Sequence, residues 1–309
     1  YVLMNFIQLS LLYLFKNYIL YLVIKILFRF LENLVITIIA NKMYPYIKNK
    51  TEKTLTKEEK ENIFTKIKGL IFHKVGNYVV LGTDNILISK FLGVAQVGLY
   101  SNYSLIIYSV TSMLNQIFSS ITASVGNLLV TTDKEKTYEV YQKVMFLNFW
   151  IYAFATTSIY NIMEPFIIFW LGEKFLLSNF VLIILSINFY MLGMRSSIGI
   201  YKEAAGIYYE DRFVPIIESI VNIIASIIFA KHFGLAGIFL GTITSSLIVV
   251  FYSLPFFVYK EVFKKSIFEY YKLYFKYAIT TTLLVIITKV TLKYLFLLTG
   301  APFLRVVIS

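Results

Sequence analysis

Long, continuous apolar runs recur along the whole of this chain, and they constrain its fold more than any other feature. Many of these runs are about as long as the 20 or so residues that a helix needs to cross the hydrocarbon core of a membrane. Only 15% of the 309 residues are charged and 58% are hydrophobic, which leaves too few polar side chains to cover a soluble surface. The chain is therefore predicted to be an integral membrane protein.

Helices are the expected spanning form, because the apolar runs are continuous and an open sheet edge leaves unpaired backbone groups in lipid. The predicted class is an all-α polytopic bundle with about ten spans. The predicted spans cover residues 1–15, 18–40, 67–92, 95–130, 141–170, 175–200, 212–230, 235–258, 270–288 and 292–309. Because Tyr1 already lies inside an apolar run, we expect the chain to be a fragment that lacks an N-terminal portion.

Lysine and arginine alternate between the connections, as the positive-inside rule requires of a multi-pass protein. One set of connections holds 19 of these residues and the opposite set holds six. We therefore predict that the first set faces the cytoplasm, and it comprises residues 41–74, 131–143, 202–212 and 260–276. This topology also accounts for the net charge of +12, so nucleic acid is not an expected partner.

A polar, lysine-rich segment at residues 41–66 divides the chain, and it is predicted to be a solvated linker. Thr56 and Glu59 within it have the spacing of a helix capping box, which predicts an interfacial helix leading into the next span. In a later span, Gly237, Gly241 and Ser245 recur every four residues. This small-residue face favours close helix packing.

Polar residues inside the spans are the candidates for a substrate path, because they are costly in lipid. Asp84 lies near the middle of its span, and it either pairs with a cation of a neighbouring helix or lines a wet path. Arg195 lies deep in another span, where it either binds an anionic group, Asp84 or a bound phosphate, or forms a structural salt bridge. The full candidate set is Asp84, Lys90, Gln116, Asn127, Arg195, Glu218 and Asn222.

The helix at residues 95–130 carries a stripe of uncharged polar residues, which suits either an aqueous cavity or hydrogen bonds between helices. The stripe consists of Ser109, Ser112, Gln116, Ser119 and Asn127. No ATP-binding loop, metalloprotease motif or nucleophile elbow is present in the sequence, and there are no cysteines. We therefore expect no catalytic residue, metal or cofactor, and transport driven by an ion gradient or by the substrate's own gradient.

Three stretches carry a family resemblance: GTDNILISKFLGVAQVGLYSNYSLI, EPFIIFWLGEKF and DRFVPIIESIVNIIASIIFAKHFGLAGIFLGT. They resemble the bacterial polysaccharide repeat-unit flippases, the Wzx-type branch of the multidrug/oligosaccharidyl-lipid/polysaccharide exporter superfamily. The resemblance covers most of the chain, and it implies two six-helix lobes that face each other across a central cavity. In those terms, residues 1–40 end the first lobe, 41–66 form the linker, 67–258 form the second lobe and 259–309 begin an additional helix pair.

The resemblance also implies a function in the bacterial inner membrane. The implied substrate is an undecaprenyl-diphosphate-linked oligosaccharide for O-antigen, lipopolysaccharide or capsule synthesis, and a polysaccharide polymerase and chain-length machinery are implied partners. Family members hold the diphosphate and sugar with cations, for which Arg195 and Lys90 are the matching residues here. Two other functions stay open: a cation-coupled multidrug antiporter that uses Asp84, and a membrane-embedded polymerase or glycosyltransferase.

Overall fold

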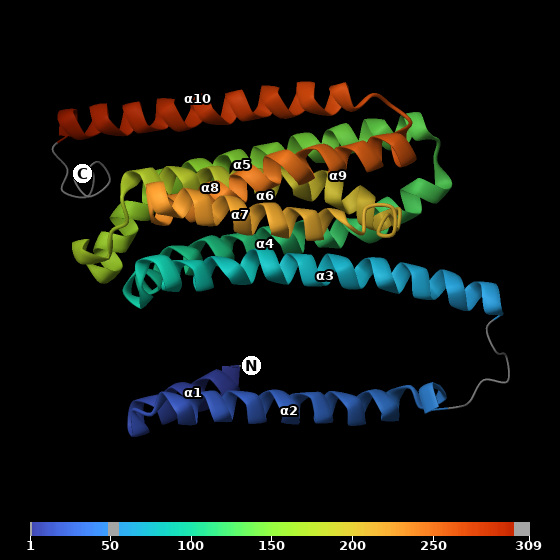
Figure 1. Ribbon diagram of the computed structural model, residues 1–309, viewed down its shortest axis with the longest axis horizontal. Helices are drawn as coiled ribbons and strands as arrows, with labels where there is room; N and C mark the ends of the chain where they lie inside the picture. Colours follow the sequence, from blue (N-terminus) through green and yellow to red (C-terminus); the bar gives the residue numbers. More distant parts are fainter. Residues whose placement is uncertain (1, 49–55, 300–309) are drawn as a thin grey trace. The chain divides into compact units, whose positions relative to one another are not determined.

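The computed structural model describes residues 2–48 and 56–299, and within these ranges the chain forms helices and short connections without a β-strand (Figure 1). The predicted all-α class is confirmed. Contacts divide the chain into two units, Tyr1–Lys60 and Glu61–Ser309, and the division falls inside the predicted linker. Residues 49–55 of that linker and 300–309 of the last predicted span lie outside the described residues.

The first unit contains two helices, α1 (Val2–Phe15) and α2 (Tyr18–Met43), followed by the short 3₁₀ turn η1 (Pro45–Lys48). Asn17 caps α2, because its side-chain oxygen accepts hydrogen bonds from the backbone N–H groups of Ile19 and Leu20 at 3.0 and 3.1 Å. These two helices agree with the spans predicted at residues 1–15 and 18–40.

The predicted capping box starts helix α3 (Lys57–Leu92). The Glu59 carboxylate accepts a 2.8 Å hydrogen bond from the Thr56 backbone N–H, and the Thr56 hydroxyl accepts a 3.2 Å bond from the Glu59 N–H. The bonds that Glu59 accepts from the backbone and the hydroxyl of Thr56 lower the pKa of its carboxyl group. The predicted interfacial helix and the span after it form one continuous helix.

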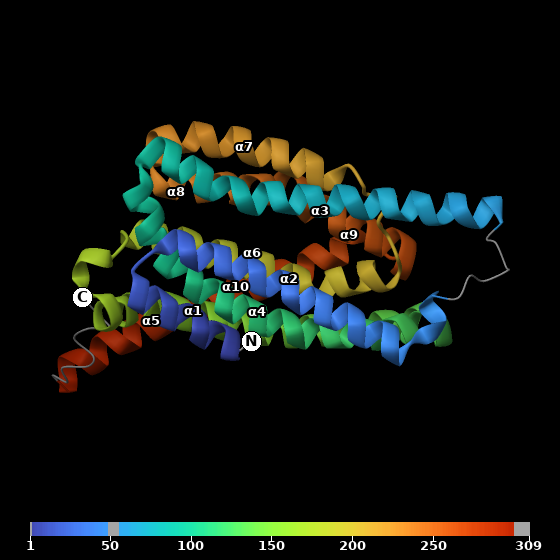
Figure 2. The ribbon, with the colours of Figure 1, turned by 90° about the horizontal axis from the view of Figure 1, so that it is seen from below.

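The second unit is a bundle of long helices joined by short turns (Figures 1 and 2). After α3 come α4 (Val94–Thr131), α5 (Lys134–Leu171), η2 (Glu173–Phe175), α6 (Asn179–Ala204), α7 (Val214–Phe233), α8 (Leu235–Ser245), the π-helical η3 (Ser246–Val250), α9 (Phe251–Val258), the π-helical η4 (Tyr259–Phe263) and α10 (Ile267–Thr299). The turns before α4 and α8 both end on a glycine with positive φ, Gly93 (91°) and Gly234 (57°), a conformation that other residues rarely adopt.

Five helical segments of the described chain are long and apolar enough to cross a membrane, judged by length and composition alone. They are Val94–Thr131, Asn179–Ala204, Val214–Phe233, Leu235–Phe263 and Ile267–Tyr294. The chain is therefore a multi-pass membrane protein. Its other long helices, α2, α3 and α5, carry charged residues near one end or within them.

The predicted break between spans at residues 270–288 and 292–309 is wrong over the described residues, because α10 continues without interruption to Thr299. Lys289 and Lys293 suggested the break, but no glycine or proline accompanies them. Lys289 instead donates a 2.7 Å hydrogen bond to the Tyr160 hydroxyl and lies 4.7 Å from that ring, so its charge is accommodated on the helix surface.

In the second unit, the start of α3 and the α4–α5, α6–α7 and η4–α10 connections gather at one end of the bundle (Figure 1). Asp211 in the α6–α7 loop forms an ion pair with Lys202 of α6 and a 2.8 Å contact with the His73 imidazole of α3. Lys265 pairs with Glu135 at 3.2 Å across the same end. The parts of the predicted cytoplasmic loops that belong to this unit therefore share one of its ends, and their orientation in the membrane stays a prediction.

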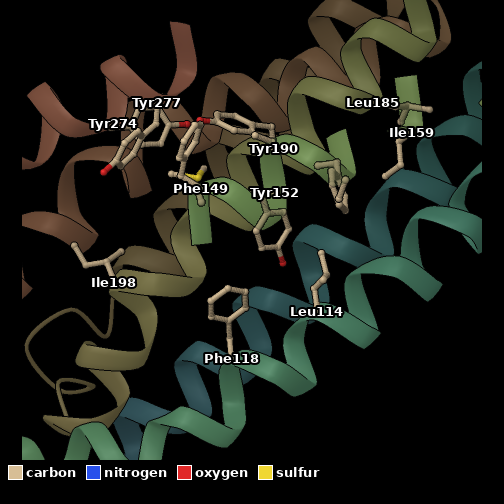
Figure 3. Close-up of a cluster of buried hydrophobic side chains, with 14 of the residues drawn as sticks. Leu114, Phe118, Phe149, Tyr152, Ile159, Leu185, Tyr190, Ile198, Tyr274 and Tyr277 are labelled. Atoms are coloured by element: carbon tan, nitrogen blue, oxygen red, sulfur yellow. The ribbon is translucent and has the colours of Figure 1, made fainter. Parts of the chain in front are cut away.

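Aromatic side chains fill much of the core between α5, α6 and α10 (Figure 3). The rings of Phe149 and Tyr277 stack with their centroids 4.3 Å apart and join α5 to α10. Tyr152 packs against Gly193 of α6 so closely that a Cβ atom on the glycine would lie 2.0 Å from the ring. Gly193 thus lets the α5 tyrosine reach the backbone of α6.

The predicted small-residue face of α8 packs directly on the backbone of α7. A Cβ atom on Gly237 would lie 2.1 Å from the Phe229 carbonyl oxygen, and one on Gly241 would lie 2.4 Å from the Ser226 backbone nitrogen. The Ser226 hydroxyl donates a 2.9 Å hydrogen bond to the Ile238 carbonyl across this contact. Close backbone approach therefore holds α7 against α8, as expected for helices in lipid.

Substituting Gly241→Ala should destabilise the protein by about 1–3 kcal/mol, because the added methyl group forces the α7 and α8 backbones apart. Thermal unfolding of the purified protein in detergent measures this as a lower Tm. Gly199→Ala in α6 is the matched control, since nothing lies within 4 Å of a Cβ at that position. A Gly241→Ala protein as stable as the Gly199→Ala protein would contradict the packing described here.

Candidate functional site

A cavity of about 660 Å³ lies in the second unit, and residues of α3, α4, α5, α6, α7, α8 and η3 line it. Its described lining combines four kinds of side chain: two carboxyl groups, uncharged hydroxyl and amide groups, aromatic rings and aliphatic groups. The volume lies within the range of about 300–1,000 Å³ that is typical of small-molecule sites.

Asp84 of α3 lines the cavity, and one of its carboxyl oxygens is buried without a hydrogen-bond partner. No residue of the described chain forms an ion pair with it, so the pairing with a neighbouring cation that we considered is not found. Tyr100 and Tyr108 of α4 line the same cavity. A buried carboxyl oxygen without a partner can form a hydrogen bond with a ligand.

The polar stripe of α4 turns partly toward the cavity. Ser112, Gln116 and Ser119 line it, whereas Ser109 and Asn127 of the predicted stripe do not. The lining face of α4 also includes Ser104, Tyr108, Thr111 and Asn115. Because an α-helix turns about 100° per residue, this face lies to one side of the line through Ser109 and Asn127.

Helices α6 and α8 form another part of the wall. Asn188 lines the cavity, and its side-chain N–H group donates a 3.1 Å hydrogen bond to the Phe239 carbonyl of α8. The rings of Phe239 and Tyr100 lie 4.8 Å apart beside it. Tyr152 reaches the lining from α5 because Gly193 has no side chain. This part of the wall therefore combines polar, aromatic and aliphatic groups.

Arg195 of α6 pairs with Glu218 of α7 across 3.4 Å. Of the alternatives considered for Arg195, the structural salt bridge is found, and its partner is Glu218 rather than Asp84. Glu218 lines the cavity, whereas Arg195 is outside the described lining. One guanidinium nitrogen of Arg195, Nη2, is buried without a hydrogen-bond partner.

Three other predicted residues lie away from the lining. The Lys90 ammonium group is 6.0 Å from the Phe91 ring at the end of α3. Asn127 is exposed near the end of α4. Asn222 is completely buried, and its side-chain N–H group donates a 3.1 Å hydrogen bond to Thr242, a residue that does line the cavity. The structure thus brings Asp84, Gln116 and Glu218 together, with Arg195 and Asn222 behind them.

The described part of the lining contains Asp84 and Glu218 but no lysine, arginine or histidine. This charge distribution differs from the cationic cavity that the resemblance implied, and Arg195, one of the two cations implied for it, is paired with Glu218 outside the described lining. Tyr100, Tyr108 and Tyr152 were not among the predicted site residues. Their sequence signal is weak, since tyrosines in membrane proteins also form interfacial belts.

The helices and the cavity define a class: an all-α polytopic membrane protein with a polar and aromatic cavity among its helices. Residues 1–180 match a family described as polysaccharide biosynthesis protein, and the chain belongs to that family. No curated protein and no solved structure matches this chain. The protein therefore has a role in polysaccharide biosynthesis. Asp84, Gln116 and Tyr152 lie inside the matched range, and Arg195 and Glu218 lie beyond it.

Breaking the Arg195–Glu218 pair should cost about 1–3 kcal/mol, because either partner alone leaves a charge in a poorly hydrated place. This loss of stability is smaller than that for a fully buried pair, since the two side chains are 20% and 11% exposed. Thermal unfolding of Arg195→Gln, Glu218→Gln and the double variant in detergent measures the coupling. We expect the double variant to lose less stability than the two single variants together.

Lys143→Gln provides the control for this cycle, because it breaks an exposed pair with Glu139 in which the side chains are 70% and 49% exposed. Its stability should change by no more than about 0.5 kcal/mol. Additive losses for the Arg195 and Glu218 variants would show that the two side chains do not interact.

Proposed function

We propose that the protein is a flippase that moves undecaprenyl-diphosphate-linked oligosaccharide repeat units across the bacterial inner membrane for surface polysaccharide synthesis. One observation carries the proposal: a chain of a polysaccharide biosynthesis family holds a cavity of about 660 Å³ among membrane helices. The O-antigen, lipopolysaccharide or capsule pathways would be its setting, with a polymerase and chain-length machinery as its partners.

The chemistry of the wall supports a carbohydrate as the cavity's ligand. Hydroxyl and amide side chains such as Ser112, Asn115 and Gln116 exchange hydrogen bonds with sugar hydroxyl groups. Aromatic rings such as Tyr108 and Phe239 offer flat apolar surface to the C–H face of a pyranose. A cavity for an apolar ligand needs few of these polar groups.

The diphosphate of the substrate binds outside this cavity wall. Phosphates bind to arginine, lysine or helix N-termini, and the described lining contains neither basic side chain. Arg195 and Lys90, the cations implied for this role, both lie outside the described lining. The wall of the second unit therefore contacts the saccharide, and the diphosphate binds outside the described lining.

Transport then follows from alternating exposure of the cavity to the two sides of the membrane, with residues 41–74, 131–143, 202–212 and 260–276 facing the cytoplasm. The sequence contains no nucleotide-binding loop, so the step is driven by an ion gradient or by the substrate's own gradient. No bond in the saccharide is made or broken during this step, and the protein is not an enzyme.

A cation-coupled multidrug antiporter is the second candidate function. The specific observation that favours it is the pair of carboxyl groups, Asp84 and Glu218, in a lining without a basic residue among those described. An acidic cavity suits an organic cation, and expression of the protein would then raise the minimal inhibitory concentration of cationic drugs. Family membership in polysaccharide biosynthesis favours the flippase.

Filling the cavity should abolish polysaccharide export. Ser112→Trp places an indole in the lining of α4, so the saccharide loses its space and surface polysaccharide should fall to the level of a strain without the gene. The measurement is surface polysaccharide in that strain after complementation, at equal amounts of membrane-inserted protein.

Ser109→Trp is the matched control, three residues earlier on α4. Ser109 is exposed, as Ser112 is, but it lies on a different groove, between α4 and α5. Its indole should leave export near the wild-type level. Full export with Ser112→Trp would remove the cavity from the transport path.

A further inference from the structure

We infer that this cavity selects saccharides without acidic sugars, so the repeat unit that it carries is built from neutral or amino sugars and excludes uronic acids. The inference rests on the proposed function and deepens it by naming the substrate class. Its basis is the charge of the lining, in which Asp84 and Glu218 are the charged side chains among the described residues.

The two carboxyl groups differ in whether a neighbouring cation neutralises their charge. The Glu218 carboxylate has Arg195 at 3.4 Å, so this pair is close to neutral as a whole. Asp84 has no ion pair within the described chain, and one of its oxygens is buried without a hydrogen bond. The balance of charge on the wall is therefore acidic, and Asp84 determines it.

A uronic acid would bring a further carboxyl group into this space. An ionised Asp84 would repel it, and no basic side chain of the described lining would pair with it, so its carboxylate would lose water without gaining a cation. Two unit charges about 8 Å apart, at an effective dielectric constant of about 20, repel strongly enough to change an equilibrium more than tenfold. No basic side chain of the described lining offsets this repulsion.

A neutral sugar meets the same groups favourably. A hydroxyl group donates to the free carboxyl oxygen of Asp84 and satisfies a buried acceptor that otherwise has no partner. An amino sugar gains an additional charge-assisted hydrogen bond there. The remaining polar groups of the wall, Ser112, Asn115 and Gln116 among them, are uncharged and bind hydroxyl groups of either kind.

The test uses the complete protein in vesicles of phosphatidylcholine, whose surface has no net charge. Two labelled probes of equal length are compared: a polyprenyl-diphosphate-linked triglucoside, and the same molecule with one glucose replaced by glucuronic acid. Transfer is followed as the fraction of each probe that becomes accessible to membrane-impermeant periodate. We expect the acidic probe to flip at least about tenfold more slowly than the neutral one.

Asp84→Asn should bring the two rates together, because the amide keeps the shape of the side chain and removes its charge. Gln116→Lys is the second variant, since it leaves Asp84 intact and adds a cation to the same cavity, and it should lower the preference likewise. Glu173→Gln removes an exposed carboxylate outside the described lining, and it should leave the ratio of rates unchanged.

Equal rates for the two probes with the wild-type protein would overturn the selectivity and leave the flippase proposal standing. A preference for the neutral probe that persists in both Asp84→Asn and Gln116→Lys would also overturn it, because the wall's charge would then not be its cause. Failure of the protein to flip either probe would overturn the proposed function, and the selectivity with it.

Discussion

Close contact between helix backbones is the interaction on which the second unit depends. Lipid offers little hydrophobic driving force between helices, so association relies on van der Waals packing and interhelical hydrogen bonds. Gly237 and Gly241 let α8 lie directly on α7, and Gly193 lets the Tyr152 ring lie on α6. These contacts hold α7 against α8 and α5 against α6. The cavity exists because α3 and α4 complete a wall around helices that are already held in place.

Polar side chains in the bundle serve two separate purposes. One group bridges helices and is sealed from any ligand: Ser226 donates to the Ile238 carbonyl, and Asn148 donates to the Gly193 carbonyl at 3.2 Å. The other group faces the cavity, and within the described chain the side chains of its members Asp84 and Gln116 have no hydrogen bond to another helix. Satisfied polar groups stabilise the bundle, whereas groups with spare hydrogen-bonding capacity are those that a ligand can use.

Hydropathy alone predicts the helical class, and most helices lie within a few residues of their expected ranges. It fails at Lys289, where a charge suggested a turn, because a neighbouring tyrosine accommodates the ammonium group and no helix-breaking residue is present. The site could be predicted in part. Asp84, Gln116 and Glu218 are polar residues in apolar spans, which a sequence reveals, but the partner of Arg195 is set by the packing of α6 against α7. The tyrosines of the wall resemble tyrosines elsewhere in the chain, so only their positions distinguish them.

The charge of the whole chain says little about the charge of its cavity. Nineteen of the 29 lysines and arginines lie in the four connections predicted from the sequence, so the net charge of +12 reflects where the connections fall and not the lining of the cavity. Within the spans, a charge persists only where packing or function maintains it. Arg195 is explained by Glu218, whereas Asp84 has no such structural partner in the described chain. A buried carboxyl group without a partner disfavours folding, and its position at the cavity wall, beside Tyr100 and Tyr108, gives it a reason to be retained: a hydroxyl-bearing ligand completes its hydrogen bonds.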